Sequence, residues 1–462
     1  MAAAIRRVGG RTFAALSLPN YRLYLGGQSI SLVGTWMQMT AMSWLVLELT
    51  HSATKLGVIV ALQTLPVLVL GPYGGVVADR VDKRRMMIVL QSLMGLQALI
   101  LGVLTVAGAI HYWEIGALAL MLGVNSAFEN PARQSFMLEL VGPEHLRNAV
   151  SLNSTTVNAA RIVGPATGGL LIAAVGTGVC FLFNAASFVA VISSLVRLNA
   201  AQLRPTEPVV AERGQLREGL RYVRATPALL IPLLMMALTG CLAFEFPVSL
   251  PYMASKGLHV GSSGYGFMTA AMALGAVVGG LVVATRGRTG TWPMVFAVAG
   301  TGVTMALAAL APGIEIELVA LALLGAANVS FMSIGNATMQ LRAAPEMRGR
   351  VMALWFVAFQ GSTPIGGPIV GAVMSGYGAR VGLGLGAVAC AVAAAAGALA
   401  MRARGINPRG GSSARSVVAS QAGALRPAGS PAEAGVSALV GQRVPAPEDP
   451  VALTKTGAST LS

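Results

Sequence analysis

The sequence predicts an all-α membrane protein with twelve transmembrane helices, arranged as two six-helix bundles. Three observations lead to this prediction: long apolar segments recur, basic residues gather in alternate loops, and the second half repeats features of the first. Of the 462 residues, 55% are hydrophobic and only 11% are charged. The surface of a soluble protein is about a quarter charged or more, so this composition indicates that lipid covers much of the chain.

Apolar segments of about 20 residues recur from Tyr24 to Met401. At about 1.5 Å per helical residue, each is long enough to cross a hydrocarbon core of roughly 30 Å. The predicted spans are residues 22–48, 56–78, 87–109, 114–133, 148–174, 178–198, 228–250, 264–285, 292–311, 317–339, 351–374 and 381–401.

The net charge of +15 could indicate a nucleic-acid partner, but the basic residues follow the loops rather than one soluble face. With the N-terminus inside, the inner segments before the tail hold 21 lysines and arginines, and the outer ones hold only Lys55, Lys256 and Arg380. This bias predicts that both termini lie in the cytoplasm. We therefore expect a multi-pass protein of a bacterial inner membrane, with the lipid bilayer as its surroundings and no nucleic-acid partner.

The polar segments divide the chain. A stretch with Pro205 and Pro208 separates the halves, and its second part predicts a short amphipathic helix with Leu220 and Val223 on one face. After Arg402 the composition becomes rich in Pro, Ala, Gly, Ser and Arg without periodicity, as is typical of disorder. The predicted organisation is a bundle over 1–198, a cytoplasmic central loop over 199–227, a bundle over 228–402 and a disordered cytoplasmic tail over 403–462.

Several kinds of chemistry are not indicated. The three cysteines, Cys180, Cys241 and Cys390, fall inside apolar spans, so we expect no disulfide framework. The sequence has no Walker loop, which removes ATP as a direct energy source, and no nucleophile elbow, zinc spacing or dinucleotide fingerprint in a plausible context. We expect neither an enzyme nor a bound metal or cofactor.

The two halves repeat each other. Pro143-Glu144 recurs as Pro345-Glu346 at an offset of 202 residues. Gly164-Pro165-x-x-Gly168-Gly169 recurs as Gly367-Pro368-x-x-Gly371-Ala372 at an offset of 203. Parallel six-helix repeats of this kind place a substrate cavity between two bundles, near the middle of the bilayer.

The loop after the second span carries the most specific motif. It reads Gly75-Val76-Val77-Ala78-Asp79-Arg80-Val81-Asp82-Lys83-Arg84-Arg85. This run resembles the G-x-x-x-D-R-x-G-R-R/K-R signature of the major facilitator superfamily, with Asp82 where the family usually has Gly. Gly75 would let helices approach closely, and Asp79 could accept hydrogen bonds from a helix N-terminus of the other bundle.

The resemblance implies that this loop latches the outward-facing state. The residues expected to form the latch are Gly75, Asp79, Arg80, Lys83 and Arg84, with Glu129 as a further candidate at the end of span four. The alternative is a basic loop that only fixes topology.

In span five, Gly164, Pro165, Gly168 and Gly169 resemble the core of the motif that marks drug:proton antiporters. Ser151 and Ala160 replace glycines of the longer pattern. Proline and small residues suit a hinge or a sealed contact with the opposite bundle. The alternative is ordinary packing of small residues.

Arg161 and Glu245 are charges expected inside the membrane, where a charge must face water or a partner. Arg161 shares a helical face with Asn158 and Pro165, so it should border the cavity, with Glu245 or Glu129 as candidate partners. Glu245 is a candidate for proton coupling. The alternatives are a structural polar network for Arg161 and a solvated helix end for Glu245.

Two further spans present uncharged polar faces. Gln28, Thr35 and Gln38 align in span one, and Asn328 and Asn336 align in span ten. The resemblance to the superfamily implies that the first, fourth, seventh and tenth helices line the cavity. The uncharged polar faces of spans one and ten therefore suggest a bulky amphiphilic substrate. The alternative is hydrogen bonding between helices.

Further motifs resemble one branch of the superfamily, the enterobactin and macrolide exporters: Asn20-Tyr21-Arg22-Leu23-Tyr24, Glu218-Gly219-Leu220-Arg221-Tyr222-Val223 and Met347-Arg348-Gly349-Arg350-Val351. The resemblance implies a monomeric secondary transporter that exports a drug, macrolide or siderophore in exchange for protons. A metabolite importer, a non-transporting sensor or scaffold and a lipid translocator remain alternatives.

Overall fold

The computed structural model describes residues 14–204, 215–287 and 289–403, and within these ranges the regular structure is entirely helical. The predicted disordered tail lies outside the described residues except for Ala403, as does part of the predicted central loop. The first half contains α2 (Pro19–Thr50), α3 (Ala53–Arg80), α4 (Lys83–Val106), α5 (Tyr112–Val175) and α6 (Thr177–Arg197). A short helix, α7 (Gln215–Ala225), follows where the amphipathic helix is predicted.

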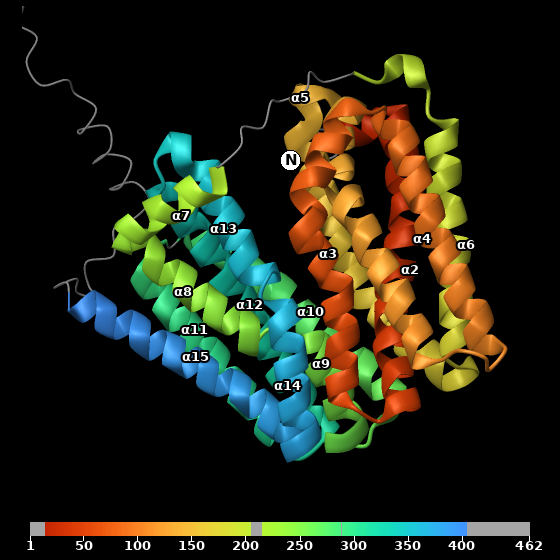
Figure 1. The fold of residues 1–462 in the computed structure, drawn as a ribbon. Coiled ribbons are helices and arrows are strands. Elements are labelled where there is room, and N and C mark those ends of the chain that lie inside the picture. The colour runs from red at the N-terminus through yellow and green to blue at the C-terminus, as the bar shows by residue number, and fades with distance from the viewer. Residues whose placement is uncertain (1–13, 205–214, 288, 404–462) are drawn as a thin grey trace, which may run out of the picture. The chain divides into compact units, whose positions relative to one another are not determined.

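The second half is more finely divided. Its helices are α8 (Pro227–Leu242), α9 (Phe246–Tyr252), α10 (Gly261–Arg286), α11 (Thr291–Leu310), α12 (Ile314–Arg342), α13 (Arg348–Gln360), α14 (Thr363–Tyr377) and α15 (Ala379–Arg402). Helices α2–α6 pack largely with one another, and α10, α11, α12 and α15 do the same in the second half. Figure 1 shows the two groups, with α14 beside α3 where they meet.

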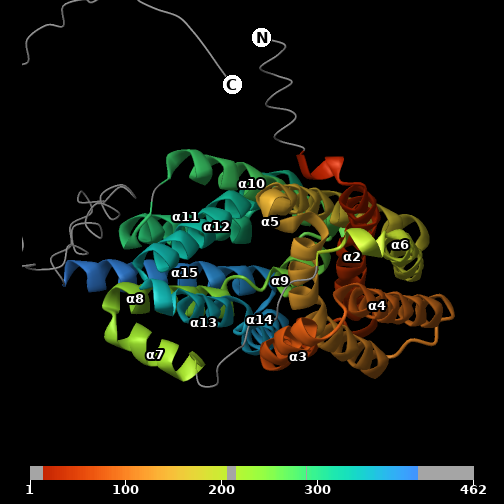
Figure 2. The same ribbon diagram turned by 90° about the horizontal axis from the view of Figure 1, so that it is seen from above.

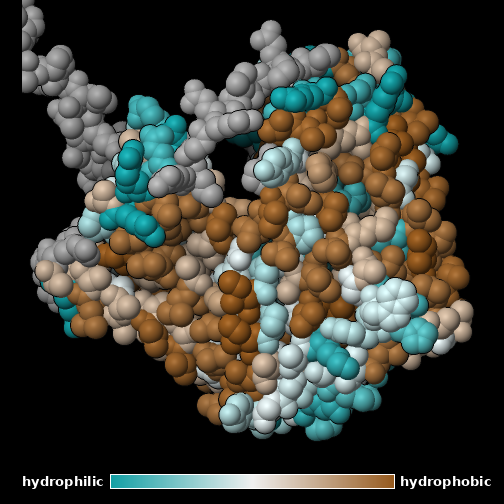
Figure 3. Space-filling view, viewed as in Figure 1, coloured by the Kyte–Doolittle hydropathy of each residue, from teal (hydrophilic) through white to brown (hydrophobic). Residues whose placement is uncertain are grey.

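Ten helical segments of the described chain are long and apolar enough to cross a membrane. One of them, α5, is 64 residues long and contains the two predicted spans 114–133 and 148–174. The predicted span 351–374 falls on α13 and α14, each shorter than a membrane crossing. Twelve crossings therefore follow if α5 counts as two and α13 with α14 as one. Figure 3 shows hydrophobic residues across the middle of the molecule and hydrophilic ones towards both ends.

Local sequence explains where the helices begin and break. Gly142 adopts φ 72° and ψ 168°, which interrupts α5 just before Pro143. The helix therefore extends beyond the predicted end at residue 133. Phe246 begins α9 with Pro247 in its first turn, so the predicted span 228–250 is broken beside Glu245.

The residue that departs from the family motif has a structural role. Asp82 precedes α4, and its Oδ1 accepts a hydrogen bond of 2.7 Å from the backbone N–H of Arg85. A carboxylate suits this position because it caps the first turn and faces the positive end of the helix. Asp82 thus replaces the usual glycine with an N-cap.

Tight connections recur with the sequence repeat. Gly176 joins α5 to α6 at φ 85°, and Gly378, 202 residues later, joins α14 to α15 at φ 99°. Only glycine adopts this backbone conformation without strain. The structural repeat therefore extends beyond the motifs seen in the sequence.

Candidate functional site

A cavity of about 1530 Å³ lies between the two groups of helices and is lined by residues of both. It reaches from Leu56 and Ile59, early in α3, to Gly349 and Arg350 in the first turn of α13. We call the side where α3 ends and α4 and α13 begin, which carries Arg80, Arg84 and Arg348, the arginine-rich side. The cavity extends towards this side.

On the opposite side, two close backbone contacts are among those that join the bundles, and both use the repeated Gly-Pro motif. A Cβ on Gly57 of α3 would collide with the carbonyl of Gly367 in α14, and one on Gly371 would collide with that of Ala53. Close by, the backbone N–H and the hydroxyl of Thr54 each donate to the Ser375 hydroxyl at 3.1 Å. Figure 2 shows α14 beside α3 from a second direction.

The second contact joins α5 to α10 and uses the first copy of the motif. A Cβ on Gly169 would lie 2.6 Å from the Ser262 carbonyl oxygen and 2.9 Å from the Gly266 Cα, while one on Gly266 would lie 2.5 Å from the Pro165 carbonyl oxygen. Gly164 and Gly168 instead face Trp36 and Met37 of α2, in their own bundle. In both contacts, the helix with the motif thus packs against the helix that forms the second predicted span of the other half.

On the arginine-rich side the predicted latch residues are dispersed. Arg80 is exposed, and Asp79 is partly exposed with no ion pair or hydrogen bond among the described residues. Arg84 donates to the carbonyl oxygens of Leu195 and Val196, at the end of α6. Glu129 is buried and pairs with Arg133 at 3.2 Å rather than with the loop. In this arrangement the loop does not engage the other bundle.

Two further latch residues have other surroundings in this structure than a contact with the opposite bundle. A Cβ on Gly75 would meet nothing within 4 Å, and the close approach occurs at Gly74, which faces the Ala127 carbonyl of α5. Lys83 does not approach Asp79: it is 6% exposed and its Nζ donates to Glu139 Oε1 at 2.8 Å. Glu139 was missed in the sequence, although a carboxylate within Met137-Leu138-Glu139-Leu140-Val141 is a signal for a buried partner.

Lys83→Ala should lower stability strongly, because it leaves the Glu139 carboxylate buried without its cation. Breaking such a pair costs about 3–5 kcal/mol. The measurement is thermal unfolding of the purified protein in detergent, with Arg85→Ala as the control, because Arg85 is exposed on the same loop. The double variant Lys83→Met/Glu139→Leu should recover most of the loss, and equal unfolding temperatures for Lys83→Ala and wild type would contradict the role of the pair.

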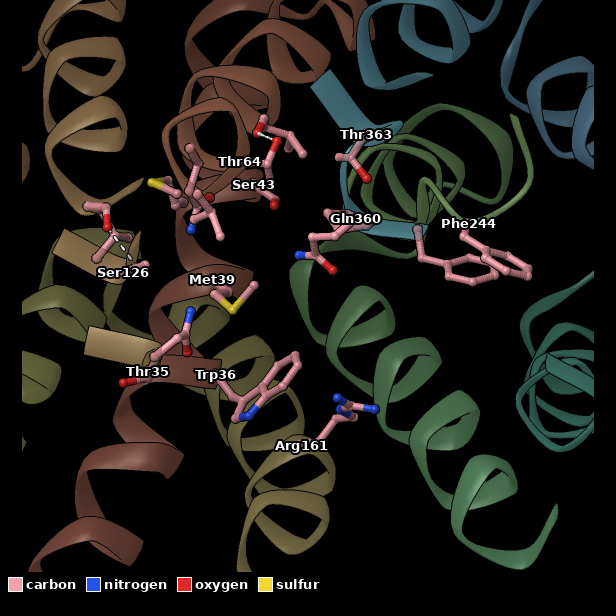
Figure 4. Close-up of a pocket in the computed structure, with 18 of the residues that line it drawn as sticks. Thr35, Trp36, Met39, Ser43, Thr64, Ser126, Arg161, Phe244, Gln360 and Thr363 are labelled. Atoms are coloured by element: carbon pink, nitrogen blue, oxygen red, sulfur yellow. Dashed lines mark hydrogen bonds between the residues drawn. The ribbon is translucent and has the colours of Figure 1, made fainter. Parts of the chain in front are cut away.

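Arg161 lines the cavity, as predicted, but meets neither candidate partner. The guanidinium carbon lies 4.8 Å from the centre of the Trp36 ring. Within the described chain it forms no ion pair, and its Nε is buried without a hydrogen-bond partner. Figure 4 shows Arg161 and Trp36 together beside the open space. Asn158, on the same face, donates to the Ser154 carbonyl oxygen of its own helix and does not line the cavity.

Glu245 also lines the cavity, from the break between α8 and α9, and is 1% exposed. Its carboxylate lies beside the hydroxyl of Thr363 in α14. A Cβ on Gly366 would lie 2.8 Å from its Oε1, and one on Gly367 would lie 3.5 Å from its Oε2. The carboxylate therefore sits directly behind the backbone that packs against α3. The solvated helix end considered for this residue is excluded.

Some of the uncharged polar residues predicted for spans one and ten line the cavity, and the others do not. Thr35 and Gln38 line the cavity, where Gln38 donates to Gln97 at 3.0 Å and accepts from Asn184 at 2.7 Å. This network within the first bundle was not visible in the sequence, because it joins three helices. The other three residues, Gln28, Asn328 and Asn336, lie outside the lining, so the expected contribution of the tenth span is not met.

Aromatic side chains form the wall of the cavity on the second bundle. Phe244, Phe246 and Phe359 line it, and Phe244 packs at 6.1–6.3 Å, between ring centres, on those two rings and on Phe331. Phe359 and the neighbouring Gln360 were not singled out in the sequence, because they lie in a span with no regular polar face. The cavity thus joins an apolar wall to a cationic and polar one.

The repeated bundles and the shared cavity define a membrane transporter of the major facilitator fold. A family model described as transmembrane secretion effector matches residues 10–413, and the chain belongs to this family. Its members and relatives are transporters and not enzymes.

Among curated relatives, the multidrug efflux pump Tap of Mycolicibacterium fortuitum is 28% identical over 73% of this chain and 86% of its own. The enterobactin exporter EntS of Shigella flexneri is 26% identical over 77% of this chain and 85% of its own. The staphyloferrin A transporter of Staphylococcus aureus is 28% identical over 57% of this chain, and the match spans 66% of that protein. The match to the uncharacterised transporter YfiS of Bacillus subtilis, 33% identical, spans only half of that protein.

Solved structures support the fold alone. The nucleoside transporter NupG aligns with a TM-score of 0.68 at 12% identity, over 83% of this chain and 99% of its own. A bacterial homologue of the human lysosomal transporter Spinster gives 0.66 at 13% identity, over 83% and 97%.

Proposed function

We propose that this protein is a proton-driven exporter of bulky amphiphilic small molecules, such as drugs, macrolides or siderophores. The observation that carries the proposal is the large cavity between two repeat-related bundles, with an aromatic wall on one side and polar groups on the other. Its volume suits a molecule larger than a sugar or an ion. The relatives Tap, a multidrug efflux pump, and EntS, an enterobactin exporter, favour export over import.

Alternating access would follow from rocking of the two bundles about the cavity. The bundles are joined at the two Gly-Pro contacts, and the cavity extends towards the arginine-rich side. If that side faces the cytoplasm of a bacterial cell, as the positive-inside bias predicts, this is the state that loads cytoplasmic substrate. We propose that the outward-facing state closes the arginine-rich side by bringing Asp79 to the N-terminus of α13, with Gly75 at the contact. The unit would be a monomer that needs no cofactor.

The test is efflux of a panel of dyes, macrolides and catecholate siderophores from cells, with and without a protonophore. Wild type should show protonophore-sensitive efflux, and Asp79→Asn should reduce it about ten-fold or more, because a conformational coupling of this kind is worth about 5- to 150-fold. The matched control is Asp82→Asn, which makes the same charge change three residues away but keeps an N-cap side chain.

Each rival function gives a different result. Uptake that rises with the gradient would indicate an importer, and altered lipid asymmetry without solute efflux would indicate a lipid translocator. If Asp79→Asn and Arg161→Ala leave the phenotype unchanged while removal of the tail abolishes it, a sensor or scaffold replaces the proposal.

A further inference from the structure

Few side chains that line the cavity are acidic or basic, and only some of them have a partner of opposite charge. Only Arg161, Glu245 and Arg350 among the lining residues are arginine, lysine, aspartate or glutamate. Arg350 is neutralised locally, because its Nη1 lies 2.8 Å from Glu218 Oε1 of α7. Glu245 is 1% exposed and its carboxylate lies against the backbone of α14. Arg161 is therefore the cation that faces the cavity without a carboxylate within the described residues.

The contact with Trp36 holds the guanidinium of Arg161 in a defined orientation. The guanidinium lies over the indole ring, at 4.8 Å from its centre. A guanidinium held this way is fixed in orientation, while its N–H groups stay free in its own plane. Such a planar set of donors matches two oxygens of a carboxylate, sulfonate or phosphate group. A partly buried cation without a counter-ion inside a membrane protein is unfavourable, so an acidic ligand group would relieve that cost.

The remaining lining is suited to the rest of the same ligand. Phe244, Phe246 and Phe359 supply an apolar wall from the second bundle, and Met39 lies next to Trp36 on α2. Aromatic and methionine side chains adapt to bulky apolar bodies of varied shape. The wall and the cation belong to different bundles, so one ligand would bridge them.

We propose that the substrate is an anionic amphiphile whose acidic group binds Arg161 and whose apolar body lies along Phe244, Phe246 and Phe359. This inference rests on the proposed function and narrows its substrate class. A cationic substrate is disfavoured because the carboxylate that would attract it, Glu245, is covered, whereas Arg161 is only partly buried.

The test uses three fluorescent probes that share one body: 1-pyrenebutyrate, 1-pyrenebutanol and a pyrenebutyl trimethylammonium ion. Binding to the purified full-length protein in phosphatidylcholine nanodiscs is followed by energy transfer from protein tryptophan to pyrene, with empty nanodiscs subtracted. Wild type should bind the anion about ten-fold or more tightly than the alcohol, as charge-assisted hydrogen bonds allow. Arg161→Gln should remove this preference and leave the affinity for the alcohol unchanged, and Arg161→Lys should keep part of it.

Arg350→Gln is the matched control, because it removes a cation from the same cavity that is already paired. It should change the preference for the anion less than about three-fold. Unchanged affinity for the alcohol in each variant shows that the protein is folded. The inference is overturned if wild type does not prefer the anion, if the ammonium probe binds most tightly, if no probe binds saturably, or if Arg161→Gln keeps the preference. The measurement needs no gradient, so absence of cellular efflux would count against the exporter and not against this site.

Discussion

Gly57→Leu should reduce transport about ten-fold or more while the protein still inserts into the membrane. Gly57 has no room for a side chain, because its Cβ would collide with the Gly367 carbonyl of α14. Overpacking at such a contact costs about 1–3 kcal/mol, and about 1.4 kcal/mol is a factor of ten in an equilibrium. Since this contact exists only while the bundles are joined on that side, the substitution penalises one state of the cycle rather than the fold.

A cross-linking measurement identifies the state that is lost. Thr54→Cys/Ser375→Cys should form a cross-link with a short thiol reagent, since the two wild-type hydroxyls are 3.1 Å apart. Gly57→Leu in the same background should lower the cross-linked fraction. The control is Gly26→Leu in α2, where a Cβ meets nothing within 4 Å. Full transport and undiminished cross-linking in Gly57→Leu would show that the contact can yield without cost.

The positions of the helices and the importance of the repeated Gly-Pro motif could be predicted from the sequence. A membrane span is a local property, readable from the length of an apolar segment, so most helices begin and end near the predicted residues. The motif could be recognised because backbone contacts require small residues at fixed spacing. That its two copies build two close backbone contacts between the bundles was not predictable, because the partners Gly57 and Gly266 carry no signal beyond being glycine.

Other parts of the site could not be predicted. Periodicity shows that Asn328 and Asn336 share a helical face, but not how α12 is turned about its axis, and that face lies outside the cavity lining. The Lys83–Glu139 pair joins residues 56 positions apart, which spacing cannot reveal. The contacts of the latch residues change with the state of the transporter. We expect them to form only in the outward-facing state, so the present structure shows these residues apart from the other bundle.

Glu245→Gln should uncouple transport from the proton gradient. The substitution keeps the size of the side chain and removes its ability to bind and release a proton. Efflux should fall to within about two-fold of de-energised wild type, while exchange of substrate across the membrane without a gradient should persist, because an embedded carboxylate serves coupling rather than substrate passage.

The position of the carboxylate gives the physical reason. Glu245 lies at the break between α8 and α9, against Gly366 and Gly367, and Gly367 also meets Gly57 in α3 of the first bundle. A change of charge there is transmitted to the contact that must open for the cycle to proceed. Glu245 is also one of the residues around the cavity, so this covered carboxylate lies near both the substrate and the contact with α3.

The chain provides a matched control in Glu317, another carboxylate that is fully buried in the second bundle but does not line the cavity. Glu317→Gln makes the same chemical change near Arg380. If burial alone made a carboxylate a coupling group, both variants would lose the proton dependence of efflux. We expect only Glu245→Gln to do so, and a Glu245→Gln protein whose efflux still collapses on addition of a protonophore would move the coupling site elsewhere.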